Sequence, residues 1–310
     1  MHASPAGLLR MGLQRDAPAA STAPGRPRCG LGGERTRRWR RQSTMWILIA
    51  YGLLWLALIT YLVYPWIERH NRCWGAIGIS LGAWLCLTVG LVERSIAAGH
   101  WPLANRYEFA LSFVWASLGL HLLLEASWRG RSSGSFVMAV VLFVASYAVT
   151  RPETMQAITP LLPALRSPWL QLHAASAVIA YAACGIAAGF GLAYMFTRRM
   201  PKRLPPIADL ERAMERSVAL GFPWLTFSIL AGAIWAQLAW ARLWGWDPKE
   251  VWALLTWLWY LMVLHLYPMP HWRGRRMAVL VLIGFGWVMF TFIGVPWLVR
   301  LVQLESLHGF

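Results

Sequence analysis

Long apolar runs alternate with short polar connections along most of this chain of 310 residues. Several runs approach the roughly 20 residues that a helix needs to cross a bilayer, and the pattern predicts about eight transmembrane helices. The predicted spans are 45–64, 74–92, 107–124, 136–149, 169–196, 220–239, 251–266 and 277–295. The sequence therefore indicates an all-α, polytopic membrane protein with a tryptophan-rich loop between the sixth and seventh spans.

The basic residues are unevenly divided between the connections. The loops after the first, third, fifth and seventh spans hold 13 arginines and lysines, whereas the other loops and the C-terminal end hold seven. By the positive-inside rule, the first set lies in the cytoplasm, and the tryptophan-rich loop and the C-terminus lie outside. The formal charge of +16 is thus spread over loops and forms no folded basic face, which argues against nucleic-acid binding.

Residues 1–44 differ from the rest of the chain. They are rich in Ala, Pro, Gly and Arg, with nine arginines and no apolar periodicity, so we expect them to be disordered. With eight spans, the outside location of this segment would contradict the positive-inside rule. We therefore expect Met45 to be the natural start and 45–310 to form the transmembrane domain. The alternative is that the segment is genuine and one weak span is miscounted.

Several kinds of chemistry lack their motifs in this chain. The four cysteines form neither a CxxC pair nor a CxxCH motif, which argues against a thioredoxin-like site, a zinc ribbon and covalently bound c-type haem on this chain. The sequence also lacks a Ser-His-Asp order, and it has no HExxH, P-loop or GxGxxG motif in the structural context that such a motif requires. Zinc-protease, nucleotide-binding and hydrolase functions are therefore unsupported.

Six tryptophans fall within residues 240–259, around a single Asp-Pro step. Indoles grouped at a membrane boundary can hold a flat aromatic molecule, although tryptophans also line membrane interfaces without any ligand. The candidate binding residues are Trp240, Trp244, Trp246, Asp247 and Trp252. The Asp-Pro-Lys-Glu sequence that starts at Asp247 also predicts a capping box that opens the seventh span. We expect Asp247 to cap this helix and to fix the tryptophans above it.

Two histidines are predicted on the same outer face as the tryptophans. His173 lies near the outer end of the span 169–196, and His308 lies close to the C-terminus. Imidazoles on opposite sides of a flat aromatic surface can supply both axial ligands to haem iron. Either histidine alone can instead be a packed or solvated residue.

His121 and His265 lie within predicted spans, each fourteen residues past the predicted outer start of its helix. At ~1.5 Å per residue, both reach a similar depth in the inner leaflet, ~21 Å below that start. Histidines inside a span are costly and suggest function, and a bis-imidazole haem site would account for both. The alternative is that each ring reaches the inner interface and bonds a neighbouring carbonyl group.

Together these segments resemble a known family. Residues 244–252, Trp-Gly-Trp-Asp-Pro-Lys-Glu-Val-Trp, resemble the WWD motif of the CcsA/ResC cytochrome c biogenesis proteins of system II. Residues 99–108 resemble that family's GHFPLxNxYE segment, and 163–173 and 306–309 resemble its two external histidine segments. The resemblance covers nearly everything after Met45 and excludes the arginine-rich start. The WWD motif alone would not distinguish this family from the related CcmC and CcmF proteins.

The resemblance implies a ligand set. His173 and His308 would flank an external haem b above the tryptophans, as axial ligands of its iron. His265 would ligate haem iron within the membrane, and His121 is a weaker candidate for the opposite ligand because a partner subunit can supply it.

The resemblance also implies a reaction, a partner and a place. The chain would be a subunit of holocytochrome c synthase, a thioether-forming lyase that attaches haem to the CxxCH motifs of apocytochrome c on the outer face of the bacterial inner membrane. It would need a ResB/CcsB-type membrane partner. Two other functions stay open: a haem exporter without ligase activity, and a b-type haem subunit for electron transfer.

Overall fold

The computed structural model describes residues 31–67, 73–127, 133–152, 156–157, 166–197, 199 and 204–302. Every regular element within these ranges is helical, which confirms the predicted all-α class. The elements are α1 (Leu31–Ile67), α2 (Trp74–Ala98), α3 (Arg106–Ser127), α4 (Gly134–Val149), α6 (Pro168–Thr197), α7 (Ile207–Trp240), α8 (Pro248–Leu266), the short 3₁₀ turn η2 (Pro270–Trp272), α9 (Arg275–Met289), the π-helical segment η3 (Phe290–Gly294) and α10 (Val295–Val302).

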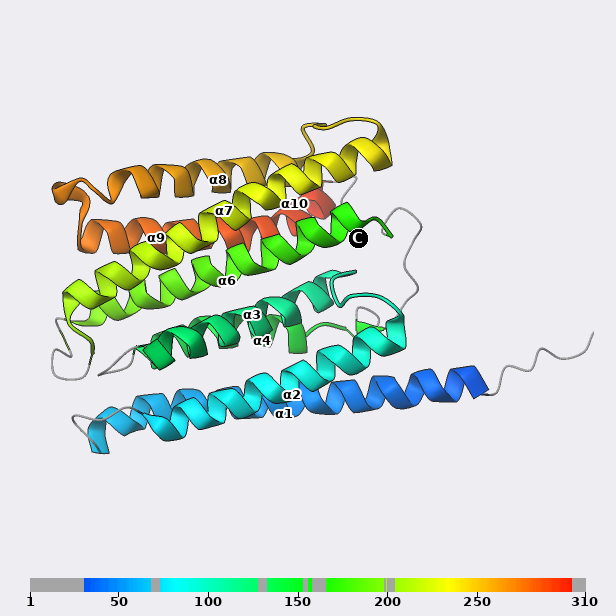
Figure 1. The fold of residues 1–310 in the computed structure, drawn as a ribbon, viewed down its shortest axis with the longest axis horizontal. Helices are drawn as coiled ribbons and strands as arrows, with labels where there is room; N and C mark the ends of the chain where they lie inside the picture. The colour runs from blue at the N-terminus through cyan, green and yellow to red at the C-terminus, as the bar shows by residue number, and fades with distance from the viewer. Residues whose placement is uncertain are drawn as a thin grey trace, which may run out of the picture.

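The long helices lie side by side and alternate in direction, as short connections require (Figure 1). One end of the bundle gathers the connection 99–105 after α2, the start of α6, the connection 241–247 after α7, and α10. We call this end the tryptophan end. Segments that are far apart in the sequence therefore meet at one membrane boundary.

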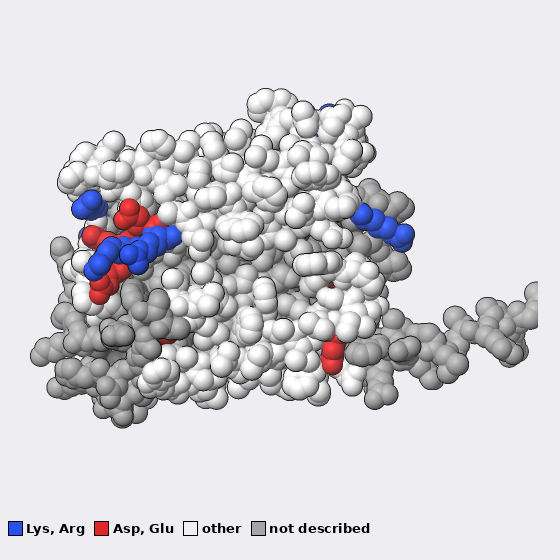
Figure 2. All heavy atoms as spheres, in the orientation of Figure 1, with Lys and Arg blue, Asp and Glu red and all other residues white. Residues whose placement is uncertain are grey.

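The predicted spans all correspond to helices. Among the described residues, six helical stretches are long and apolar enough to cross a membrane. The last of them joins α9, η3 and α10, while α4 is a shorter apolar helix of 16 residues. On the face shown in Figure 2, the charged side chains that are described lie towards the two ends of the bundle, and the band between them is uncharged. This is the surface of a multi-span membrane protein.

The first helix begins earlier than expected. α1 starts at Leu31 rather than at Met45, so residues 31–44 are helical and not disordered as predicted. Residues 31–44 contain no proline that would interrupt a helix, and arginine is a good helix former. These residues also extend an existing helix, which needs no new nucleation. Residues 1–30 lie outside the described residues, and the start at Met45 stays a prediction.

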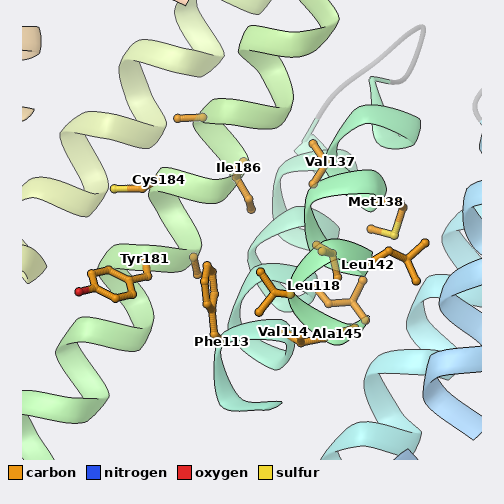
Figure 3. Packing of buried hydrophobic residues seen from close by; sticks show 14 of the residues in the cluster. Phe113, Val114, Leu118, Val137, Met138, Leu142, Ala145, Tyr181, Cys184 and Ile186 are labelled. Atoms are coloured by element: carbon orange, nitrogen blue, oxygen red, sulfur yellow. The ribbon is translucent and has the colours of Figure 1, made fainter. Parts of the chain in front are cut away.

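α6 is the centre of the bundle and packs against α3, α4, α7 and α9. Its small residues allow close approach: a Cβ atom added at Gly189 would lie 2.8 Å from Cα of Val137 on α4. Small residues are the usual means by which membrane helices pack closely. Buried apolar side chains such as Phe113 of α3, Val137 of α4 and Ile186 of α6 lie where these helices pack together (Figure 3).

Candidate functional site

A cavity of about 180 Å³ lies at the tryptophan end, between α3, α6, α7 and α8, and η3 contributes to its wall. A single water needs only about 10–15 Å³, so the cavity can take part of a larger molecule. Most of its lining is apolar, and its polar groups include His173 of α6, Arg106 of α3 and Lys249 of α8. Two indoles, Trp235 and Trp244, also line it.

His173 is half-buried and held in one tautomer by α7. Its Nδ1 lies 2.8 Å from the carbonyl oxygen of Ser228, and the Ser228 hydroxyl in turn donates to the carbonyl oxygen of His173 at 3.0 Å. A carbonyl oxygen can only accept, so Nδ1 of His173 carries the proton. Nε2 is then the nitrogen with the lone pair that a metal ligand needs, and a backbone hydrogen bond of this kind is a common support for such a ligand.

The predicted tryptophans do not form one continuous surface. Trp244 lines the cavity, whereas the side chain of Trp246 is 74% exposed and meets Trp244 edge-on, with ring centroids 5.9 Å apart. Trp240 packs against Trp235, with centroids 4.7 Å apart. Trp252 contributes no part of the lining and packs on Phe290 and Trp287.

Trp235 was not predicted, because it precedes the tryptophan-rich segment. Its spacing does carry a signal, since Ser228, Gly232 and Trp235 follow each other at intervals of four and three residues and therefore share one face of α7. All three line the cavity.

The predicted capping box at the start of α8 is confirmed. The Asp247 carboxylate accepts a hydrogen bond from the Lys249 backbone N–H at 2.9 Å. Glu250 Oε2 accepts from the backbone N–H groups of Gly245 and Asp247, at 2.8 and 3.2 Å. The two carboxylates therefore hold the loop that carries Trp244 and Trp246 against the first turn of α8.

We expect Asp247→Ala to lower stability by about 1 kcal/mol, because it removes the side-chain acceptor of the cap. Thermal unfolding of the purified protein in detergent measures the change. Asp247→Asn is the matched control, since its amide oxygen still accepts from Lys249. Equal unfolding temperatures for wild type and Asp247→Ala would show that the cap adds nothing measurable.

Of the other predicted histidines, the two that the structure describes, His121 and His265, do not line this cavity. His308 lies outside the described residues, so its predicted place opposite His173 stays a prediction. His265 is exposed, and its Nδ1 lies 2.8 Å from the carbonyl oxygen of Leu261 in its own helix. His121 is buried, with Nε2 3.3 Å from the Tyr61 hydroxyl.

The structure does not bring His121 and His265 together, and the contact of His265 with the Leu261 carbonyl oxygen matches the alternative interpretation of that histidine. His121 faces Tyr61 of α1, with ring centroids 5.8 Å apart. His265 sits on an exposed face of α8. The sequence predicted that the two histidines lie at a similar depth in the membrane, but depth does not determine the direction in which each ring points. In the part of the chain that the structure describes, no group of three or more His, Cys, Asp or Glu side chains could hold a metal ion.

A buried ion pair supports one wall of the cavity. Arg94 of α2 and Glu108 of α3 are 2% and 1% exposed, with Nε and Oε1 2.7 Å apart. Glu108 Oε2 also accepts from the Ala104 backbone N–H at 3.0 Å. Arg94 donates to the carbonyl oxygens of Gln156 and Ala157, at 2.8 and 3.2 Å. The pair thus ties α2, α3 and residues 156–157 to the connection 99–105, part of which lines the cavity.

Comparison with known proteins places this architecture. A family model described as "Cytochrome C assembly protein" matches residues 103–302. A CcsA cytochrome c biogenesis protein of Chlamydomonas reinhardtii is 36% identical over 235 residues, which cover 73% of this chain and 65% of the relative. The CcsA protein of Pyropia yezoensis is 30% identical over 297 residues, which cover 80% of this chain and 92% of the relative. A CcsA protein of Synechococcus elongatus is 30% identical over 272 residues, which cover 71% of this chain and 83% of the relative.

A solved structure of "Cytochrome c Heme Lyase CcmF" shares the fold, with a TM-score of 0.65 at 16% identity. The superposition covers 87% of this chain but 52% of the CcmF chain, so this chain spans about half of that protein and 65% of the Chlamydomonas relative. The match to the family model and the agreement with CcsA proteins over most of the chain settle its classification. The chain belongs to the family of cytochrome c assembly proteins, as a member of the CcsA cytochrome c biogenesis proteins.

Proposed function

We propose that this chain holds haem b as a substrate at the tryptophan end and attaches it to the CxxCH cysteines of apocytochrome c, as the CcsA subunit of a system II synthase. Membership of the CcsA family gives the chain its role in cytochrome c biogenesis. The observation that carries the finer proposal is the cavity that joins His173 to the indoles of Trp235 and Trp244. An imidazole with an accepting Nε2 beside flat aromatic walls suits a metalloporphyrin.

His173 is the proposed first axial ligand of the haem iron, and His308 is the proposed second. For a haem deeper in the membrane, we propose His265 with a ligand from the partner subunit. The exposure of His265 on α8 supports this arrangement, because an exposed imidazole can meet a neighbouring protein. His121 is less suited, since it is buried against Tyr61.

The proposed reaction adds each cysteine thiol across one vinyl group of reduced haem. A C–S bond forms at the inner vinyl carbon, the thiol proton goes to the terminal carbon, and the carbon–carbon double bond becomes single. This step needs neither an oxidant nor a reductant. The chain's contribution is orientation, because well-oriented reactants reach effective molarities of about 10⁵ M or more.

We further propose a ResB/CcsB-type membrane protein as the partner. In the proposed setting, the bacterial inner membrane, the tryptophan end would face the periplasm. When residues 1–44 are set aside, as the predicted start at Met45 implies, the greater number of basic residues in the connections at the opposite end supports this orientation.

Coexpression with an apocytochrome c and a ResB-type partner tests the proposal. Haem staining after denaturing electrophoresis detects covalent attachment, and an apocytochrome with both CxxCH cysteines replaced by alanine is the control. We expect staining of the CxxCH protein alone. Haem that reaches the outer side but never stains the denatured cytochrome would instead identify an exporter.

Gly232 of α7 offers a test of the His173 position. A Cβ atom at Gly232 would lie 2.7 Å from Nδ1 of His173, whereas one at Gly286 of α9 meets nothing within 4 Å. We expect Gly232→Ala to displace the imidazole and to lower haem attachment about tenfold, in line with other changes to the support of a metal ligand. Gly286→Ala is the matched control and should behave as wild type. Equal attachment by the two variants would contradict the assigned position of His173.

A further inference from the structure

We propose that Arg106 and Lys249 bind the two propionate carboxylates of the porphyrin and so fix its rotation about the bond between iron and His173. This inference rests on the proposed function and adds an orienting role for two residues. Ligation by His173 positions the iron but leaves the macrocycle free to turn in its own plane. The two carboxylates lie on one edge of protoporphyrin, so cations that bind them select one rotation.

Both cations reach the cavity from the first turn of a helix. Arg106 is the first residue of α3, and Lys249 is the second residue of α8, just before the predicted span 251–266. The N-terminal ends of helices carry a positive partial charge that favours anions. A carboxylate between the two side chains would therefore meet full and partial positive charge from two elements.

The two cations also act on each other. Burial and the charge of Arg106 lower the pKa of Lys249 to about 8, against an opposing contribution from Asp247. Arg151 and Arg300 are near enough to Arg106 to act on its charge as well. This side of the cavity thus gathers like charges, and an anionic ligand would relieve their repulsion.

The acidic groups beside the cations already serve the backbone. Glu250 lines the cavity, but its Oε2 accepts from the N–H groups of Gly245 and Asp247. Asp247 accepts from the N–H group of Lys249. Both carboxylates keep their negative charge, but the capping box turns them towards backbone N–H groups. Among the described residues, Arg151 and Arg300 add to the positive charge of Arg106 and Lys249 near this part of the cavity.

Much of the lining that α6 and α7 contribute is apolar. The cavity is lined there by Ala174 and Ala177 of α6 and by Leu225 and Ile229 of α7. A protoporphyrin has a carboxylate edge and an opposite edge that bears methyl and vinyl groups. The lining combines cations from α3 and α8 with apolar side chains from α6 and α7, which suits a ligand with this asymmetry. In the proposed site, the held carboxylate edge would give each vinyl group a defined place relative to the peptide.

The test compares zinc protoporphyrin IX with its dimethyl ester, which has the same ring and metal but no carboxylates. Binding to the full-length chain in detergent is measured by porphyrin fluorescence. We expect the wild type to bind the diacid about tenfold more tightly than the diester or better, since hydrogen bonds to charged groups are the strong ones. Arg106→Gln and Lys249→Met should each weaken diacid binding about tenfold and leave diester binding unchanged.

Arg242→Gln is the matched control. Arg242 belongs to the same loop region as Trp244 but is exposed and outside the cavity lining, so both porphyrins should bind this variant as they bind the wild type. Arg106→Lys and Lys249→Arg keep the charge and should retain most of the preference for the diacid.

The outcomes separate the inference from the function on which it rests. Equal binding of both porphyrins by the wild type, or an unchanged preference in Arg106→Gln and Lys249→Met, would overturn the propionate assignment while the haem site stands. Failure of the wild type to bind either porphyrin would overturn the proposed haem site and this inference with it. The comparison in the wild type does not depend on the folding of any variant.

Discussion

Replacing His173 with alanine is expected to lower covalent haem attachment by about tenfold or more. Loss of an iron ligand should reduce attachment at least as much as loss of a neighbouring group that orients the ligand. The loss should be partly reversed by added imidazole, which occupies the vacant position on the iron. The measurement is haem staining of the denatured cytochrome from cells that express wild type or variant. Such rescue distinguishes loss of a ligand from loss of the fold.

Two controls sharpen this prediction. His271→Ala alters an exposed histidine of η2, away from the cavity lining, and should leave attachment and its response to imidazole unchanged. Ser228→Ala keeps the carbonyl oxygen that accepts from His173 and should have a small effect. Full attachment by a double variant that lacks both His173 and His308 would reject their assignment as axial ligands.

Removal of one partner of the Arg94–Glu108 pair is the second change expected to have a large effect. Glu108→Leu leaves the guanidinium of Arg94 buried without its carboxylate, a change that costs about 3–5 kcal/mol in other buried pairs. It also removes the acceptor for the Ala104 N–H group and should loosen the connection 99–105, which leads into α3 at Arg106. We expect a large fall in the temperature of unfolding in detergent.

The double variant Arg94→Met with Glu108→Leu should be more stable than Glu108→Leu alone, since an apolar pair leaves no buried charge. The matched control is Asp209→Asn, which breaks an ion pair with Arg212 whose side chain is 63% exposed. Such exposed pairs contribute about 0–1 kcal/mol. A similar loss from Glu108→Leu and Asp209→Asn would contradict the structural importance of the buried pair.

The sequence predicts those features that depend on neighbouring residues. The spans follow from apolar runs of membrane length, and the capping box at Asp247 and Glu250 follows from a spacing of three residues. The support of His173 was beyond reach, because Ser228 is 55 residues away along the chain and meets it only when α6 packs on α7. Arg94 was likewise missed, since its contact with Glu108 depends on how α2 and α3 are joined.

The tryptophans show a different limit. Their spacing suggested one continuous surface, yet Trp244 faces the cavity and Trp246 projects into the surroundings. Ala241 and Trp246 both adopt a φ of +57°, in the left-handed region that residues other than glycine seldom occupy. Such turns redirect successive side chains, so neither helical nor strand periodicity predicts where each indole points.

The π-helical segment η3 has a consequence for the charge around the cavity. A π-helical turn holds one residue more than an α-helical turn, and an α-helix advances about 100° per residue. The additional residue therefore rotates all later residues about the helix axis. With this offset, Thr291 and Phe292 lie in the cavity wall, and Arg300 of α10 lies within electrostatic range of Arg106. Deleting a single residue from η3 would rotate Arg300 to another side of its helix, so the length of this turn sets where the charge of Arg300 stands relative to Arg106.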